Sequence, residues 1–379
     1  MKIGIEGQRL FRMKKHGMDM VALELIKNLQ EIDHENEYFI FIKPDEDKSC
    51  LKETANFHLI ELSGGPYPSW EQFALPRAAK KYGCEILHCT SNTAPISTTI
   101  PLVITLHDII YLESVSILKK GGTWYQKLGN MYRRYVVPKV VKNSKKIITV
   151  SNFEKNRIKG FFGFPESDKR LIAVYNGVGD YFKPILDTIE LKRVKDKYHL
   201  PHKFAFFLGN TDPKKNTKGV LKAFSDYLKS GNEPLELVML DYEKSALNSL
   251  LYEIGDNELM NHIHLTGYVV NTDLPAIYSQ CTVFLYPSLR ESFGIPMLEA
   301  MRCGCPVITS DTSSMPEVSG GAALLIDPYK PLEITAAMIS VITDNALRKE
   351  LIEKGIIQSA KFSWRAMAHE VLNIYKEIV

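Results

Sequence analysis

Two glutamates eight positions apart, Glu291 and Glu299, are the residues of this chain best suited to binding chemistry. A Gly-Ile-Pro turn lies between them, and such a turn suits the start of a helix. The backbone N–H groups near Phe293, Gly294 and Ile295 would then be unpaired helix-start donors, which favour an anion such as phosphate. Carboxylates accept hydrogen bonds from sugar hydroxyls. The segment therefore predicts a site for a ligand that carries both phosphates and hydroxyls.

The elements around this pair can be predicted from residue types. Residues 282–286 are β-branched and aromatic, which indicates a buried parallel strand that ends at Pro287. A helix is expected over 297–303, ended by Gly304, and a new strand begins at 305. Acidic residues in the first turns of a helix are also favourable through the helix dipole alone. The preceding strand and the Gly-Ile-Pro turn make a binding site the better interpretation.

Two further groups of polar residues follow apolar strands. His107 and Asp108 come after the strand expected at 102–106, and a histidine there fits a core position as well as a functional one. Asp108 would orient the histidine or cap the next segment. Lys214 and Lys215 follow the strand that starts at Phe204 and stand at a helix start, where their charge opposes the dipole. An anion bound beside the two lysines would offset this unfavourable interaction with the dipole. The alternative interpretation is a pair of solvated lysines in a turn.

Strand and helix patterns alternate along the whole chain. With 379 residues the chain is too long for one ordinary α/β core, so two domains are expected, with mostly parallel sheets covered by helices on both faces. Residues 180–203 read as the connector between them. The expected strands are 2–6, 38–43, 57–62, 86–89, 102–106, 146–150, 171–174, 204–209, 235–240, 262–265, 281–286, 305–309 and 323–326, and the expected helices include 18–31, 69–82, 118–137, 151–162, 331–343, 346–358 and 363–378.

Residues 291–299 resemble the Glu-x7-Glu signature of the GT4 family of retaining glycosyltransferases, which have the GT-B fold. The resemblance implies an α/β protein with two Rossmann-like, doubly wound parallel-sheet domains that face a central cleft. It implies an acceptor-side domain over 1–182, a nucleotide-sugar (donor) domain over 183–361, and a helix at 362–379 that crosses back to the first domain. Further segments resemble the family in the same order, namely 105–108, 175–178, 265–269, 273–278, 313–318 and 362–364.

The resemblance also implies roles near the transferred sugar. Glu291 would bind the sugar hydroxyls and orient the anomeric carbon, and Glu299 would hold the ribose hydroxyls. His107 would line the reacting carbon. Lys215, together with Lys214, would neutralise the leaving diphosphate.

Other donor contacts follow from matched loops. Gly17 matches the family's first glycine loop, although Met18 and Asp19 depart from its usual pattern. Gly267 and Tyr268 match the loop that contacts the base, and Phe293, Gly294 and Ile295 complete the donor-binding set. Many members carry an arginine about five residues before the lysine, a position near which this chain has Asn210.

The implied activity is a retaining, metal-independent hexosyl transfer from a nucleotide-diphosphate sugar, without a cofactor. The acceptor would be a saccharide or lipid-linked saccharide in cell-surface polysaccharide or glycoconjugate synthesis. Residues 70–72, Trp-Glu-Gln, resemble a segment common in mannosyltransferase-like members and favour GDP-mannose, although Trp70 fits the core as well as an acceptor contact. The alternatives are a UDP-sugar-dependent transferase, a nucleotide-sugar epimerase of the same fold, and a non-catalytic sugar-binding protein.

Composition narrows the partners. The net charge of +3 and the scattered Lys and Arg residues do not indicate nucleic-acid binding. No apolar run approaches the roughly 20 residues of a membrane span, and the first residues read as a strand rather than a signal peptide, so a cytoplasmic protein is expected. The basic, aromatic helix at 118–137, with Lys119, Lys120, Arg133 and Arg134, fits a solvated face or a peripheral membrane contact. The six dispersed cysteines have no zinc-site spacing and are expected to be reduced thiols.

Overall fold

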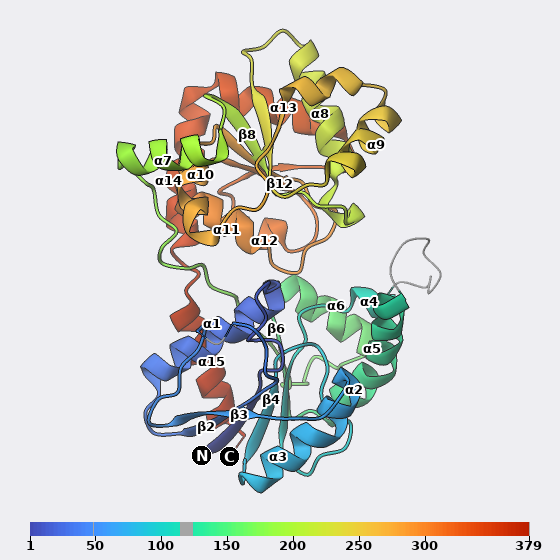
Figure 1. The fold of residues 1–379 in the computed structure, drawn as a ribbon. Coiled ribbons are helices and arrows are strands. Elements are labelled where there is room, and N and C mark those ends of the chain that lie inside the picture. Colours follow the sequence, from blue (N-terminus) through green and yellow to red (C-terminus); the bar gives the residue numbers. More distant parts are fainter. Residues whose placement is uncertain (48, 114–123, 379) are drawn as a thin grey trace. The chain divides into compact units, whose positions relative to one another are not determined.

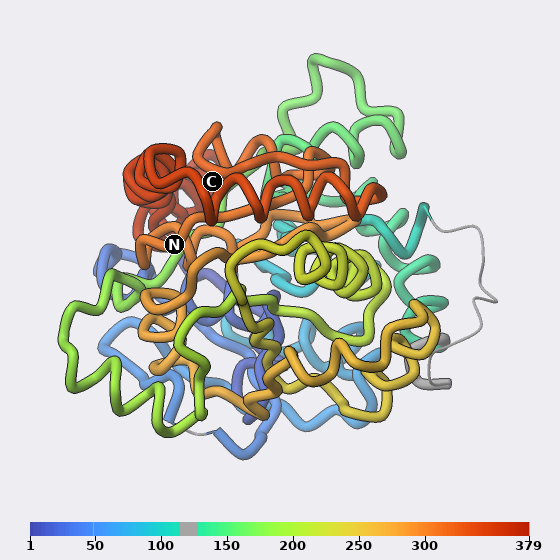
Figure 2. Tube along the Cα trace, turned by 90° about the horizontal axis from the view of Figure 1, so that it is seen from above, coloured from blue at the N-terminus to red at the C-terminus, as the bar shows by residue number. Residues whose placement is uncertain are grey.

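The chain forms two compact α/β units. The computed structural model describes residues 1–47, 49–113 and 124–378, and Figure 2 traces their course from the N-terminus (blue) to the C-terminus (red). Unit 1 comprises Met1–Gly177 together with the C-terminal segment that begins at Trp364, and unit 2 comprises Val178–Ser363. The boundaries expected from the sequence, after residues 182 and 361, differ from these by a few residues.

Unit 1 is built on a seven-stranded parallel sheet with the order β3-β2-β1-β4-β5-β6-β7 (Figure 1). The strand order reverses between β1 and β4, which pair directly with Ile3 opposite Ile86. Crossovers from these two strands leave in opposite directions, so their carboxyl ends form a topological switch point. The strands are β1 (Lys2–Glu6), β2 (Glu37–Ile42), β3 (Phe57–Glu61), β4 (Ile86–Cys89), β5 (Leu102–Thr105), β6 (Lys146–Thr149) and β7 (Leu171–Ala173).

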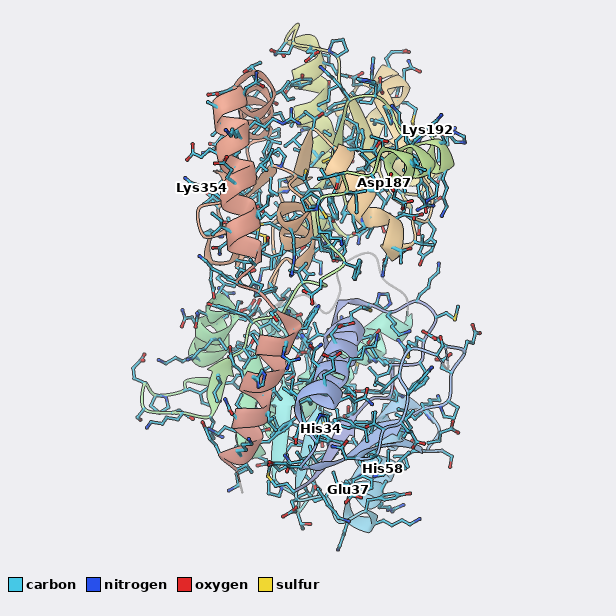
Figure 3. The ribbon with its side chains drawn as sticks, turned by 90° about the vertical axis from the view of Figure 1, so that its left-hand side faces the viewer. His34, Glu37, His58, Asp187, Lys192 and Lys354 are labelled. Carbon is cyan, nitrogen blue, oxygen red and sulfur yellow. The ribbon has the colours of Figure 1, made fainter. Side chains whose placement is uncertain are left out.

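Helices cover both faces of this sheet. One face packs on α3, α5 and α6 through a continuous apolar cluster that includes Leu87 and Val137. On the other face α15 lies beside α1, as Figures 1 and 3 show, and the Tyr375 hydroxyl on α15 lies 2.6 Å from Nδ1 of His88 on β4. The helices are α1 (Gly17–Ile32), α2 (Tyr67–Ser69), a π-helical turn (Trp70–Ala74), α3 (Leu75–Lys81), α4 (Ile110–Glu113), α5 (Trp124–Asn143), α6 (Asn152–Phe162) and α15 (Trp364–Lys376).

The amino-terminal edge of this sheet carries surface charge pairs. Glu37 begins β2 and lies 3.2 Å from the Lys2 amine and 3.4 Å from Nε2 of His58 on β3 (Figure 3). These side chains are partly exposed, so such pairs contribute little to stability. The buried polar groups of unit 1 described below lie at the opposite edge.

Two helix predictions in unit 1 differ from the structure. The helix expected over 69–82 is interrupted by the π turn Trp70–Ala74. The helix expected over 118–137 continues through Pro138 to Asn143, and its first residues fall outside the described part of the chain. Proline removes one helical hydrogen bond. The buried valines on both sides of Pro138, which pack into the core, offset that loss.

Unit 2 is built on a six-stranded parallel sheet with the order β10-β9-β8-β11-β12-β13 (Figure 1). Its strand order reverses between β8 and β11, where Phe207 lies opposite Leu285. The strands are β8 (Phe204–Phe207), β9 (Glu236–Met239), β10 (Ile263–Leu265), β11 (Val283–Tyr286), β12 (Val307–Ser310) and β13 (Leu324–Ile326). The helices are α7 (Thr188–Tyr198), α8 (Thr217–Lys229), α9 (Lys244–Ile254), α10 (Leu274–Gln280), α11 (Ile295–Arg302), α12 (Met315–Ser319), α13 (Pro331–Thr343) and α14 (Asn345–Ser359), with 3-10 turns at Pro213–Lys215, Asn257–His262 and Asn271–Asp273.

The expected connector region contains a helix of unit 2. Helix α7 packs on α10 and holds the buried Asp273 with three donors. Arg193 Nη2, Lys197 Nζ and Tyr198 Oη lie 2.6, 2.7 and 2.8 Å from its carboxylate oxygens. Such a fully bonded carboxylate fixes α7 on the domain.

The six cysteines are free thiols, as expected. Cys303 and Cys305 are buried beside Gly304, where the chain passes from α11 to β12. Within the described residues, no group of three or more His, Cys, Asp or Glu side chains is arranged to hold a metal ion.

Candidate functional site

The switch point of unit 2 brings Lys215 and Glu291 together. Lys215 follows β8 and Glu291 follows the adjacent strand β11, and the Lys215 amine lies 2.6 Å from Oε1 of Glu291. Only 16% and 13% of the two side chains is exposed. The amine also lies 3.4 Å from the Tyr286 hydroxyl and 5.1 Å from the centre of its ring. The sequence predicted both residues for the site but not their direct ion pair.

A hydrogen-bonded clamp fixes the loop that carries Lys215. Asn216 has a φ of +61°, and its side-chain amide donates to the backbone oxygens of Pro287 (3.1 Å) and Pro328 (2.7 Å). The Leu289 backbone N–H donates to the Lys214 oxygen at 2.7 Å. The loops after β8, β11 and β13 are therefore joined to one another, which sets the position of Lys215. Sequence reasoning missed Asn216, and its only local signal was an asparagine between a 3-10 turn and a helix.

Gly294 is the residue before α11 and has a backbone conformation that favours glycine. Its φ is +94°, and a Cβ atom there would lie 2.5 Å from the Met315 methyl carbon. The helix begins at Ile295, two residues earlier than expected, with proline in its first turn. The residue at the N-cap position is Gly294, which has no side chain to cap the helix start. Phe293 is buried against Phe362, with ring centres 5.7 Å apart, so it supports the turn from inside.

Glu299 lies one turn into α11. Its Oε2 accepts a hydrogen bond of 3.2 Å from the Tyr278 hydroxyl on α10. Burial raises the pKa of this carboxyl from 4.5 to about 7, and the Tyr278 bond opposes part of that rise. The two glutamates thus differ: Glu291 is held by a lysine, and Glu299 is close to its titration midpoint at neutral pH.

The other residues expected to bind the donor do not take part in the Lys215–Glu291 ion pair. Lys214 is partly exposed, with its amine 3.6 Å from Asp212, and does not share the Lys215 position. Asn210 accepts a 2.9 Å hydrogen bond from the Asp212 backbone N–H, and this bond stabilises the turn between the two residues. Gly267 has a φ of +68°, and Tyr268 beside it is exposed, in the loop that follows β10 at the same sheet edge.

His107 is buried after β5 in unit 1. Its backbone N–H donates to Oδ1 of Asn92 at 2.6 Å, and its Nε2 lies 3.0 Å from the Thr90 backbone oxygen. A carbonyl only accepts, so Nε2 carries the hydrogen and Nδ1 of the neutral ring is an acceptor. Burial lowers the pKa of His107, which keeps the ring neutral. Asp108 accepts a hydrogen bond from the Ile110 N–H and caps α4.

Gly17 is the first residue of α1, directly after the loop that follows β1. It has no positive φ, and a Cβ atom there would meet nothing within 4 Å, so unit 1 itself does not require glycine. Trp70, in contrast, is fully buried and donates to the Leu62 oxygen, so it is a core residue rather than an acceptor contact.

Among the residues that the structure describes, several buried polar atoms have no hydrogen-bond partner, and they lie near the carboxyl ends of strands. Buried polar atoms are normally bonded, so such atoms call for an explanation. A polar ligand at these sheet edges would supply the missing partners. Their signal in the sequence was a polar residue at the end of an apolar strand or shortly after it. They are Arg9 Nε, Asp19 Oδ1, Tyr111 Oη, Thr149 Oγ1 and Asn176 Oδ1 in unit 1, and Thr312 Oγ1 in unit 2.

Two family models match the chain in succession. Glycosyltransferase Family 4 matches residues 16–180, and Glycosyl transferases group 1 matches residues 189–358. The chain belongs to the GT4 family of glycosyltransferases. The expected GT4 membership is thereby confirmed, and the Glu-x7-Glu segment lies inside the second match.

Several relatives of this GT4 chain are named mannosyltransferases. O-antigen chain mannosyltransferase B of Escherichia coli is 33% identical over 238 residues, which cover 62% of this chain and 61% of that protein. O-antigen chain mannosyltransferase RfbU of Salmonella typhimurium is 30% identical over 258 residues, 66% of this chain and 64% of that protein. The serotype-specific mannosyltransferase WbdA of E. coli is 32% identical over 203 residues, 53% of this chain and 25% of that protein. Each match covers less than two thirds of the relative.

Solved structures match over the whole chain. The HepE protein of Anabaena in complex with UDP-glucose has a TM-score of 0.76 at 17% identity, over 99% of both chains. Sucrose-phosphate synthase of Thermosynechococcus elongatus has a TM-score of 0.75 at 16% identity, over 100% of this chain and 98% of that one. This likeness shows the fold, and with the two parallel sheets it confirms the expected GT-B class.

Proposed function

We propose that this GT4 chain is a retaining, metal-independent glycosyltransferase that moves mannose from GDP-mannose to a saccharide or lipid-linked saccharide acceptor. The pathway would be cell-surface polysaccharide or glycoconjugate synthesis. The observation that carries the proposal is the Lys215–Glu291 ion pair at the β8/β11 switch point, next to the glycine-started helix α11. One sheet edge thus combines a cation, helix-start N–H groups and two carboxylates, as a nucleotide-diphosphate sugar requires.

The residues divide the work by chemistry. Lys215 and the first N–H groups of α11 would stabilise the negative charge that develops on the leaving diphosphate. Glu291 would accept hydrogen bonds from the sugar hydroxyls, and Glu299 from the ribose hydroxyls. When a donor binds, its phosphates would join Glu291 around the Lys215 amine. The exposed loop at Gly267 and Tyr268 would contact the base.

The choice of GDP-mannose rests on the relatives that are named O-antigen mannosyltransferases. The Trp70-Glu71-Gln72 resemblance is consistent with it. A UDP-sugar is the second candidate, because a structural neighbour was solved with UDP-glucose. The two donors differ in the base and in the sugar but share the diphosphate and the ribose, so Lys215 and Glu299 would serve either, and Glu291 would bind the hydroxyls of either sugar.

A thermal-shift screen over GDP-, UDP-, ADP- and dTDP-sugars tests the donor. A ligand that binds the folded chain raises its melting temperature by mass action. The largest rise is expected with GDP-mannose, at a concentration where mannose alone gives none. A larger rise with a UDP-sugar would overturn the GDP-mannose assignment, and no rise with any of them would overturn the proposed function.

Transfer itself needs a separate test. Incubation with donor and saccharide acceptor should form a glycoside with the anomeric configuration of the donor, read by NMR. An inverted product would refute the retaining mechanism. Donor converted to a different sugar without acceptor would point to an epimerase, and donor binding without any turnover to a binding protein. Activity should persist in EDTA if no metal is needed.

We also propose that the chain works at the cytoplasmic face of a membrane as a peripheral protein. On α5 the exposed side chains of Leu128, Met131 and Tyr135 recur at helical spacing, and the Lys139 amine lies 3.3 Å from the centre of the Tyr135 ring. An apolar stripe beside cations suits an anionic lipid surface. The lysines at 119 and 120 lie outside the described residues. No helix among those described has the length and apolar character of a membrane span.

Sedimentation with vesicles tests this location. The wild type should sediment with vesicles that contain anionic lipid and less with purely zwitterionic ones. Met131→Glu should reduce sedimentation, because it places a negative charge in the stripe. A wild type that stays in the supernatant with both kinds of vesicle would refute the membrane proposal and leave the transferase proposal intact.

A further inference from the structure

The Trp70-Glu71-Gln72 segment forms a π-helical turn inside the helical stretch that runs from Tyr67 to Lys81. Trp70 and Glu71 are fully buried, and the next residue but one, Phe73, is 58% exposed. Neighbouring residues on a regular α-helix point in different directions, about 100° apart. The widened turn turns Trp70, Glu71 and Gln72 toward hydrogen-bond partners inside unit 1. Such π turns often occur at functional sites.

The Glu71 carboxylate is surrounded by hydrogen-bond donors. The Thr93 hydroxyl donates to Oε2 at 2.5 Å, and the Tyr132 hydroxyl donates to Oε1 at 2.6 Å. The Gln72 amide lies 2.9 Å from Oε1 and 2.8 Å from the Tyr132 hydroxyl. Since Thr93 donates to the carboxylate, it must accept from Tyr67, whose hydroxyl lies 2.7 Å away. Burial raises the pKa of the Glu71 carboxyl, and the hydrogen bonds from Thr93 and Tyr132 oppose that rise by favouring the charged form.

The same residues hold the loop over 90–96, which follows β4. The Gln72 side chain donates to the Ala94 oxygen (3.0 Å) and accepts from the Ile96 N–H (2.9 Å), and Thr93 is bonded to Glu71. At its other end the loop receives both polar contacts of His107 described above, through the Thr90 oxygen and the Asn92 amide. Asn92 has a φ of +67°, a conformation that a non-glycine residue keeps only when its surroundings enforce it.

We infer that Glu71 is a positioning residue for His107: through Thr93 it holds the 90–96 loop, and the loop sets the place and the tautomer of the imidazole. This inference rests on the catalytic role proposed for His107. On this inference the Trp70-Glu71-Gln72 segment is a structural brace, which means that it holds the 90–96 loop of unit 1 in place and does not contact the acceptor. Neither Glu71 nor Thr93 need touch a substrate.

Thr93→Val tests the link with little change of shape, and Glu71→Gln tests the carboxylate itself. Each should lower kcat by about 10- to 100-fold, because small displacements of a reacting group have effects of that size, and leave KM for the donor unchanged. Tyr38→Phe is the matched control. It removes a buried 2.5 Å bond between Tyr38 and Asp33 in the same unit, away from the 90–96 loop, and should leave kcat unchanged.

A double-mutant cycle separates positioning from general destabilisation. In a His107→Ala background, Thr93→Val should cost nothing further in kcat, because the residue it positions is gone. Equal losses with and without His107, or wild-type kcat in both single variants, would overturn the inference. All variants are assayed well below their melting temperatures.

NMR of the histidine rings gives a readout that does not need turnover. Thr93→Val should shift the His107 ring nitrogen signals and leave those of His88 in place, and unchanged His107 signals would overturn the inference. If the wild type transfers no sugar, the proposed function fails while this measurement still tests the brace. If the wild type is active and both Glu71→Gln and Thr93→Val match it, only the brace fails.

Discussion

At the scale of single residues, the Lys215–Glu291 pair holds two opposite charges in a largely buried position. Removing one partner of such a pair leaves the other charge uncompensated, which costs more than the pair itself contributes. A bound donor would supply new partners for both charged groups, and these contacts would favour donor binding. Two opposite effects act on Glu299. Burial favours its neutral form, whereas accepting hydrogen bonds from ribose hydroxyls requires its charged form.

Glu291→Gln should abolish most transfer without unfolding the protein. The amide keeps the shape but loses the charge that holds Lys215 and binds the sugar hydroxyls, so kcat/KM should fall at least about 100-fold. Steady-state kinetics and a melting curve measure both parts. Glu253→Gln is the control, because it breaks an exposed lysine–glutamate pair with Lys218 in the same unit and should leave kinetics unchanged. Wild-type kinetics in Glu291→Gln would contradict the assignment.

Glu299 should make donor binding depend on pH. Its pKa of about 7 means that the accepting carboxylate forms as pH rises from 6 to 8, so KM for the donor should fall over that range. In Glu299→Gln the pH dependence should be lost and KM should stay high. Initial-rate measurements at pH 6, 7 and 8 check this, and a parallel pH dependence in both proteins would assign it to another group.

The same carboxyl should reduce stability at alkaline pH. Its pKa in the folded state lies above the ordinary value of 4.5, so the folded state holds a proton that the unfolded state has released. The free energy of unfolding therefore falls as pH rises from about 4.5 to 7 and stays lower above that range, by roughly 3 kcal/mol. Glu299→Gln should be more stable than the wild type at pH 8 and not at pH 4. Equal denaturation midpoints at pH 8 would argue against a raised pKa.

At the scale of elements, the site depends on how loops are joined at the ends of neighbouring strands. Strand β8 lies beside β11, and Asn216 connects the loop after β8 to those after β11 and β13. In unit 1 the 90–96 loop after β4 has the corresponding role. In both units the loops at a switch point bear the polar groups, and the apolar strands below supply a rigid base.

Asn216→Gly should raise KM for the donor while the fold persists. Glycine accepts the left-handed backbone of this position but removes both bonds to Pro287 and Pro328, which frees the Lys215 loop. Asn216→Ala should lose the same bonds and add roughly 1 kcal/mol of backbone strain, so it should melt below the glycine variant. Donor titrations and melting curves of the two variants separate the clamp from the strain. An unchanged KM in both would show that the clamp does not position Lys215.

At the scale of the whole molecule, each unit has its own core and its own polar sheet edge, and the last described helix belongs to the first unit. Helix α15 is held by apolar contacts with α1 and by the bond between Tyr375 and His88. His88 also lies 2.8 Å from the Thr105 hydroxyl, and burial lowers its pKa to about 3. The anchor of α15 is therefore a neutral histidine.

This anchor should make unit 1 sensitive to acid. His88 is neutral when folded and would be protonated below about pH 6.5 when unfolded, so its contribution is complete above that pH and falls as pH drops toward 3. The loss approaches about 1.4 kcal/mol per pH unit in that range. His88→Gln should show a smaller loss of stability between pH 7 and 5 in denaturant titrations. Tyr375→Phe should be less stable by about 1–3 kcal/mol at pH 7. A His88→Gln slope equal to that of the wild type would contradict this account.

Much of the fold followed from local patterns. The periods of apolar residues predicted the strands to within one or two residues, because a buried parallel strand needs a continuous apolar run whatever its neighbours are. The Gly-Ile-Pro turn predicted the start of α11 nearly as well, since positive φ at Gly294 and a proline in the first turn are local properties. Glu291 and Glu299 were predicted as site residues because they lie on either side of this turn.

The pairing of side chains depended on strand order and packing, which no local pattern contains. Lys215 and Glu291 are 76 residues apart and meet only because β8 and β11 are neighbours. Glu71 was part of a recognised segment, yet its donors Thr93 and Tyr132 come from the loop after β4 and from α5, and Tyr67 on α2 is bonded to Thr93. Periodicity indicates which residues are buried, whereas the contacts between them depend on how distant elements pack together.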